Sequence, residues 1–185
     1  MKNLLHLTFL ALILVLTTAC PSDDDSGPIL SAEEALVGTW EVVEYDAEYS
    51  ASGFFNMSTT IEGRDFEGEV TFSDNPKEWE SAAGATFDIT EVFSVGGGSE
   101  TETFSVEVEK EMRSGTWEIN EDGRLEGFQM VDPDYDETPP EEIFFEVEVV
   151  NNNRIILTTN IEETFIDDGV PVDFTGTTRS VLVRK

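Results

Sequence analysis

Apolar and polar residues alternate along most of the chain beyond residue 38, the pattern of β-strands with one buried face and one wet face. The clearest runs are Phe104-Ser105-Val106-Glu107-Val108 and Phe145-Glu146-Val147-Glu148-Val149. Further strands are predicted at 39–45, 53–61, 66–72, 85–95, 113–119, 124–131, 154–165 and 172–184. No segment after Gly38 has the spacing of an amphipathic helix. The pattern therefore predicts an all-β domain.

Turn signals separate these runs, and the short connections predict that neighbouring strands are antiparallel. The signals are Glu62-Gly63, Asp74-Asn75-Pro76, Gly96-Gly97-Gly98, Asp122-Gly123, Asn151-Asn152-Asn153 and Asp167-Asp168-Gly169. About eight to ten strands in up-and-down order would leave two exposed edges unless the sheet closes on itself. We therefore expect an up-and-down antiparallel β-barrel, with an open sandwich as the alternative architecture.

A short helix is predicted just before the first strand. Ser31-Ala32-Glu33-Glu34 has the form of a capping box, in which Ser31 and Glu34 satisfy each other's backbone amides. We expect one helical turn over 31–36, ended by Gly38. In the strand that follows, strict alternation would place Trp40 and Val42 on one face and Val43 and Tyr45 on the other.

The N-terminus has the features of a secretory signal. Met1-Lys2-Asn3 is positively charged, Leu4 to Leu16 is an almost unbroken apolar run, and small residues follow it. The apolar run is shorter than the roughly twenty residues that a membrane-spanning helix needs. A retained anchor helix is the less favoured interpretation.

Ala19-Cys20 resembles the end of the lipobox of bacterial lipoproteins, in which the cysteine receives the lipid. The family usually has Leu three residues before the cysteine, where this chain has Thr17. The resemblance implies a signal peptide at 1–19, a lipid on Cys20, and an acidic tether over 20–30. It also implies localisation at the outer membrane, with partner contact to the membrane through the N-terminal lipid. The acidic tether resembles surface-export signals, and a merely solvated linker explains it equally well.

Composition excludes several functions. Ten Lys and Arg face forty Asp and Glu in 185 residues, a formal charge of -30 that repels nucleic acid. The single histidine is His6 and the single cysteine is Cys20, so the remaining chain has no imidazole or thiol for a nucleophile pair or a usual zinc site. The length suits one domain, which we place at 31–185. We expect a monomer that is not an enzyme.

Gly38-Thr39-Trp40 resembles the signature at the first strand of lipocalins, and Gly115-Thr116-Trp117 is similar to a mid-barrel hairpin of lipocalin-like lipoproteins. The motif is short, and the later-loop motifs of classical lipocalins are absent. The resemblance implies that Gly38, Trp40 and an Arg of the last strand close one end of a barrel. Arg184 is the chosen residue, with Arg179 as the alternative.

A ligand would then sit at the opposite, open mouth of the barrel. The predicted lining residues are Phe87, Ile89, Phe93, Phe104 and Phe145, although the same side chains could instead fill the interior. Glu91 shares their parity, and we interpret it as turned outward by a bulge.

Carboxylates are the remaining candidates for chemistry. Asp132, Asp134 and Asp136 alternate as calcium ligands can, but Glu137 and Ile143 stand where an EF-hand needs Gly and Glu. The favoured interpretation is an acidic, proline-rich loop without a cofactor, and calcium binding is the alternative. Other acids fall on outward strand positions.

The sequence thus predicts a lipid-anchored, non-enzymatic, lipocalin-like lipoprotein that binds a small hydrophobic ligand or a partner through its open end. The alternatives are a cell-surface structural or adhesion module with a solid core and, less favoured, a carboxylate-based hydrolase.

Overall fold

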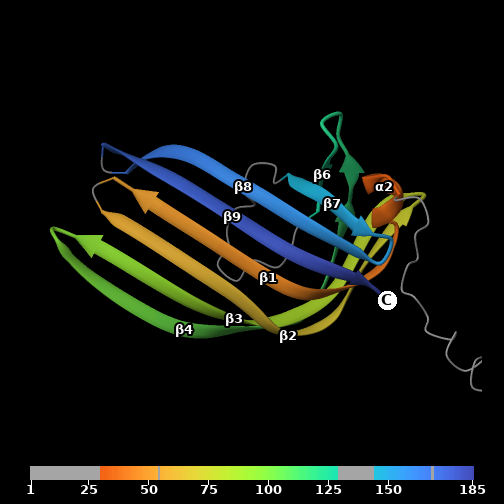
Figure 1. Cartoon of the computed structure of the whole chain (residues 1–185), viewed down its shortest axis with the longest axis horizontal. Coiled ribbons are helices and arrows are strands. Elements are labelled where there is room, and N and C mark those ends of the chain that lie inside the picture. Colours follow the sequence, from red (N-terminus) through yellow and green to blue (C-terminus); the bar gives the residue numbers. More distant parts are fainter. Residues whose placement is uncertain (1–29, 54, 129–143, 168) are drawn as a thin grey trace, which may run out of the picture.

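The computed structural model describes residues 30–53, 55–128, 144–167 and 169–185, and these form one short helix and a nine-stranded antiparallel sheet (Figure 1). The helix is α2 (Ala32–Leu36). The strands are β1 (Gly38–Ser52), β2 (Asn56–Asp74), β3 (Lys77–Val95), β4 (Gly98–Thr116), β5 (Glu118–Ile119), β6 (Arg124–Glu126), β7 (Phe145–Asn151), β8 (Arg154–Asp167) and β9 (Val170–Arg184). The predicted all-β, up-and-down architecture is confirmed.

The order of strands shows how the sheet closes. It runs β4-β3-β2-β1-β9-β8-β7-β6-β5, and its two outer members, β4 and β5, are joined in the chain by Trp117 alone. The Trp117 amide continues the β3–β4 ladder by donating to the Lys77 carbonyl at 3.3 Å, whereas β5 pairs with β6. The segment from β4 through Trp117 to β5 therefore pairs first with β3 and then with β6, and it connects the two outer strands of the sheet.

The closed end lies beside α2, where the three short strands gather, and the long strands extend away from it (Figure 1). Its interior is filled by one buried cluster to which β1, β2, β3, β7, β8 and β9 all contribute. Phe128 is central, with its ring within 6 Å of three others: Phe72 at 5.1 Å, Trp79 at 5.2 Å and Phe145 at 5.8 Å between centroids. Side chains from all round the ring therefore meet in one core.

The end of α2 is held by side chains from the first and last strands. Ser31 and Glu34 make the predicted capping box at its start. At its other end, Trp40 Nε1 donates to the Leu36 carbonyl at 2.7 Å. The Arg184 guanidinium lies over the Trp40 ring, with Cζ 4.4 Å from the centroid. The helix is thus tied to both β1 and β9.

The Arg184 guanidinium also satisfies carbonyls on both sides of this contact. It donates to the carbonyls of Ala35 at 2.8 Å, Val37 at 3.0 Å and Asn152 at 2.9 Å. Gly38 leaves the space for it, because a Cβ there would stand 2.3 Å from Arg184 Nη1, and its φ of +140° is unfavourable for other residues. In the Gly-x-Trp step, Gly38 therefore leaves room for the Arg184 guanidinium and Trp40 packs against it.

One bulge, in β2, corrects the predicted strand boundaries. The Glu62-Gly63 turn does not occur, because β2 continues through it and absorbs an irregularity between Arg64 and Glu67, where Asp65 has φ +53°. The runs predicted at 53–61 and 66–72 are thus one strand. In the same way, the run at 104–108 and most of that at 113–119 belong to β4.

The second bulge corrects a side-chain direction. The β1–β9 register shifts between Val42 and Glu44, so Tyr45 lies inward with Val42, and Val43 is exposed. Tyr45 is buried and meets Phe87 edge-on, with ring centroids 5.3 Å apart. Strict alternation had placed Tyr45 on the face opposite Trp40.

The contacts of Arg184 predict how a conservative substitution at this position changes stability. Arg184→Lys keeps the charge but cannot reach several carbonyls at once, so we expect the free energy of unfolding to fall by about 2 to 3 kcal/mol. Urea denaturation followed by tryptophan fluorescence measures it. The matched control is Arg154→Lys, whose exposed pair with Glu44 is 3.9 Å long and should change stability by less than about 0.5 kcal/mol. Equal losses in the two variants would contradict the assignment.

Candidate functional site

The open half of the sheet exposes apolar side chains on its inward face. The uninterrupted β3–β4 register from Ala85 to Val95 places Phe87, Ile89 and Phe93 on the same face as Phe104. Phe93 is 44% exposed and Phe104 is 38% exposed, while Phe165 on the inward face of β8 is 47% exposed. Inward residues are normally buried in a closed barrel. Here Phe93, Phe104 and Phe165 are open to solvent, and the concave face that they share is the candidate binding site.

The structure divides the five predicted lining residues into three groups. Phe87 and Ile89 are buried in a second core cluster with Tyr45, Ala47 and Ile61. Phe93 and Phe104 lie further out, on the exposed concave face. Phe145 belongs to the closed-end core instead. It starts β7, which pairs with β6 and with only the first part of β8, from Arg154 to Thr158. Phe145 is therefore corrected from a lining residue to a core residue.

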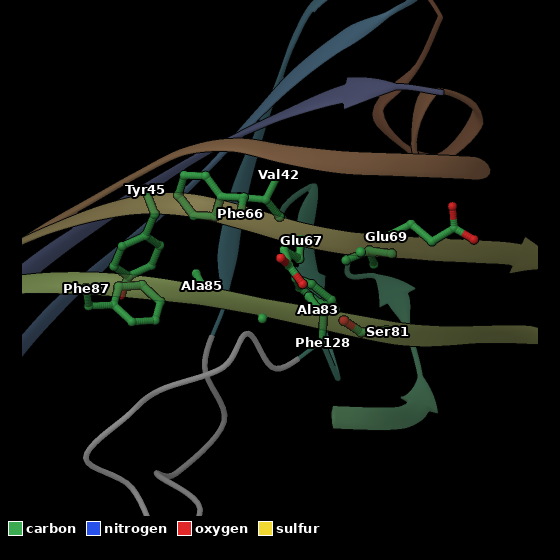
Figure 2. Close-up of a pocket in the computed structure, with 13 residues that line it drawn as sticks. Val42, Tyr45, Phe66, Glu67, Glu69, Ser81, Ala83, Ala85, Phe87 and Phe128 are labelled. Carbon is green, nitrogen blue, oxygen red and sulfur yellow. The ribbon is translucent and has the colours of Figure 1, made fainter. Parts of the chain in front are cut away.

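A small cavity lies between the two core clusters. Tyr45, Phe66, Ala85 and Phe87 border it on one side, and Val70 and Phe128 border it on the other (Figure 2). Its volume is about 40 Å³. That is room for water-sized molecules, whereas ligand pockets typically measure about 300 to 1,000 Å³. The interior between the two core clusters is therefore packed.

Aromatic contacts shape the concave face. Tyr49 and Phe174 stack with centroids 5.8 Å apart, and Phe55 lies against Phe93 at 5.3 Å. Gly176 makes room for the first pair, because a Cβ there would stand 2.3 Å from the Tyr49 ring. The only sequence signal for Gly176 is its position within a strand, where a glycine often marks a close approach.

Glu91 remains on the inward face. The predicted bulge does not occur, since the pairing of β3 with β2 and β4 is regular from Phe87 to Val95. Glu91 is half-buried and lies directly opposite Glu102 of β4 in the sheet. The concave face thus combines phenylalanines with carboxylates.

Cations are confined to the rest of the domain. The stretches that build the open half, 46–63, 86–109 and 155–178, contain no Lys or Arg and carry three, six and five acidic residues. Among the described residues, the ion pairs involve Arg64, Lys77, Arg113, Arg154, Arg179 and Lys185, which lie outside those stretches. The open half is therefore uniformly negative.

Arg179, the alternative partner for Trp40, lies on the outer face and pairs with Glu44. Its Nη1 is also 3.7 Å from Asp46 Oδ2. Partial burial raises the pKa of Asp46, and the nearby Glu44 charge adds to this more than Arg179 offsets it. Arg179 serves this surface cluster, and Arg184 takes the place over Trp40.

Other predicted features fall outside the described residues or leave no trace in them. Cys20, Asp132, Asp134 and Asp136 are outside, so the lipid site and the calcium alternative stay predictions. Within the described ranges, no three or more metal-binding side chains converge. In the same part of the chain, no helix combines the length and the apolar character needed to traverse a bilayer.

Comparison with known proteins adds little to this picture. No protein-family model and no curated protein matches the chain. The chain is similar to the S-type phycobiliprotein lyase CPES from Guillardia theta, with 11% identity, over 83% of this chain and 90% of the other. The TM-score is 0.25, which is too low for the likeness to bear on function.

The Asp46 environment predicts a pH-dependent variant. A carboxyl whose pKa rises on folding destabilises the fold above that pKa, and the penalty vanishes below the ordinary value. Asp46→Asn should therefore raise the urea midpoint at about pH 7 and leave it unchanged at about pH 3. Glu48→Gln, two residues along the same outward face of β1, is the control and should not show the gain. A gain that persists at the acid pH would rule out titration as its cause.

Proposed function

We propose that the domain binds a small apolar ligand on the concave face of its open half, and that a lipid on Cys20 holds it at a membrane. Binding would be non-enzymatic, in keeping with a chain whose only histidine and cysteine precede residue 21. The observation that carries the proposal is the exposure of inward-facing Phe93, Phe104 and Phe165 above a packed core. Soluble proteins rarely leave a contiguous apolar surface uncovered unless something binds there.

The anchoring half of the proposal rests on the N-terminal sequence. A signal-like apolar segment ends at Ala19-Cys20, and an acidic, proline-containing tether follows. Lipid on Cys20 would place the domain at the outer membrane, on either leaflet. The tether would let the concave face meet ligands at or near that membrane.

The packed closed half favours a second candidate, a structural or adhesion module. The cavity of about 40 Å³ is what a barrel built for rigidity would show. Its interior would then be solid throughout, and the exposed phenylalanines would bind no small molecule. The two candidates are separated by the following binding measurement.

The concave face predicts a ligand-binding variant. The double change Phe93→Ala and Phe104→Ala removes two aromatic contacts, so we expect the dissociation constant for the neutral dye Nile red to rise at least about tenfold. Titration of the full chain by fluorescence measures it. Met112→Ala is the control, because Met112 is 73% exposed and pairs with outward-facing Ala82 on the other face of β4. An equal loss in the control, or no dye binding at all, would count against the concave face.

The lipid anchor predicts a second variant. Cys20→Ala removes the acceptor thiol, so incorporation of labelled palmitate should cease and the protein should leave the membrane fraction. Ser22→Ala, two residues away, should retain both properties. Membrane attachment that survives Cys20→Ala would show that another segment holds the protein.

A further inference from the structure

Strand β4 is an outer strand of the sheet formed by the described residues. Its nineteen residues pair with β3 on one side, and among the described residues no strand pairs with the other side. Across the opening, the pairing of β8 with β7 ends at Thr158, and no other described strand pairs with that side of β8 beyond it. Unpaired strand edges present rows of amides and carbonyls that another strand can bind.

The hairpin geometry fixes which backbone groups of β4 face the opening. Gly96 and Gly97 form a two-residue turn with φ of +59° and +88°, so the flanking pair Val95 and Gly98 is hydrogen-bonded across the ladder. Every second pair after it is hydrogen-bonded in the same way. The amides of Thr101, Thr103 and Ser105 therefore point to the free edge.

Charge indicates what the edge can accept. Residues 98–109 of β4 include Glu100, Glu102, Glu107 and Glu109 and no Lys or Arg. Glu100 and Glu102 lie on the inward face in line with Phe104 and Val106, and Glu107 and Glu109 lie on the outward face. A second copy would bring an identical acidic strand to this edge, and like charges opposite each other are destabilising. An extended segment with basic and apolar residues in alternation complements both the charge and the pattern.

We propose that the edge of β4 over residues 98–109 accepts a basic, extended peptide segment by β-strand addition. The incoming strand bonds to the free amides of Thr101, Thr103 and Ser105. Its apolar side chains lie beside Phe104 and Val106 on the inward face, and its basic side chains lie on the outward face with Glu107 and Glu109. This site uses the backbone of an edge and does not depend on a small ligand on the concave face.

The experiment uses the full chain and a ten-residue peptide that alternates valine and lysine. Hydrogen exchange resolved to single amides should show that Thr101, Thr103 and Ser105 exchange fast in the free protein and more slowly with the peptide. A peptide that alternates valine and glutamate should give no protection. Binding of the basic peptide should weaken several-fold between about 50 and 200 mM salt.

Thr103→Pro tests the geometry directly. It removes an amide that faces the opening and leaves the β3–β4 ladder intact, so the affinity for the basic peptide should fall at least about tenfold. Thr103→Val is the matched control: both variants lose the 3.3 Å contact between the Thr90 and Thr103 hydroxyls, but valine keeps the amide. Thr103→Val should bind within about twofold of the original chain. Circular dichroism confirms that each variant is folded, and Glu107→Gln, which should weaken binding several-fold, replaces Thr103→Pro if that variant is not.

Four results would each overturn the proposal. They are slow exchange of the Thr101, Thr103 and Ser105 amides in the free protein, equal binding of the acidic peptide, equal affinity of the proline and valine variants, and protection that comes from self-association of the chain.

Discussion

The closed end of this domain depends on one arginine at the end of the last strand. Arg184 lies over Trp40 and donates to three carbonyls, two of them at the end of α2 and one in the turn between β7 and β8. Trp40 supplies the donor for the carbonyl between them, that of Leu36. The last carbonyls of a helix have no partner within the helix, and these two side chains satisfy them in a partly buried place. The helix, β1 and β9 are thereby fixed to one another.

The unequal lengths of the strands divide the domain into two halves. β5, β6 and β7 have two, three and seven residues, whereas the other six strands have fourteen to nineteen. The ring is complete only where the short strands reach, so only there do side chains from every direction meet in a core. Beyond that level the long strands continue as two walls whose outer edges, β4 and β8, have no partner strand among the described residues, with exposed phenylalanines on the inside. Stability belongs to the first half, and the candidate binding surfaces belong to the second.

Much of the fold could be predicted from local residue patterns. The capping box at Ser31, the Gly-x-Trp step and the alternating strands all have local causes that tertiary packing did not override. The two bulges could not be predicted, because turn residues such as Glu62-Gly63 also fit a twisted strand when neighbours pair with both its sides. The bulge after Val42 reverses every later side chain of β1, which is why Tyr45 was assigned to the wrong face. The concave site was predicted in part, since parity groups Phe93 with Phe104, but the shortness of β7 that removes Phe145 is a property of the whole sheet.

The pairing of the first strand with the last has a temporal consequence. β1 is complete by Ser52, yet one of its two neighbours, β9, begins only at Val170. A chain that emerges amino end first can form the β1–β2–β3–β4 meander early, but β1 and β9 cannot pair until β9 has been synthesised. Such long-range pairing makes assembly slow compared with formation of the local hairpins. During synthesis, the β1 edge of the meander therefore stays unpaired over the translation of more than a hundred residues.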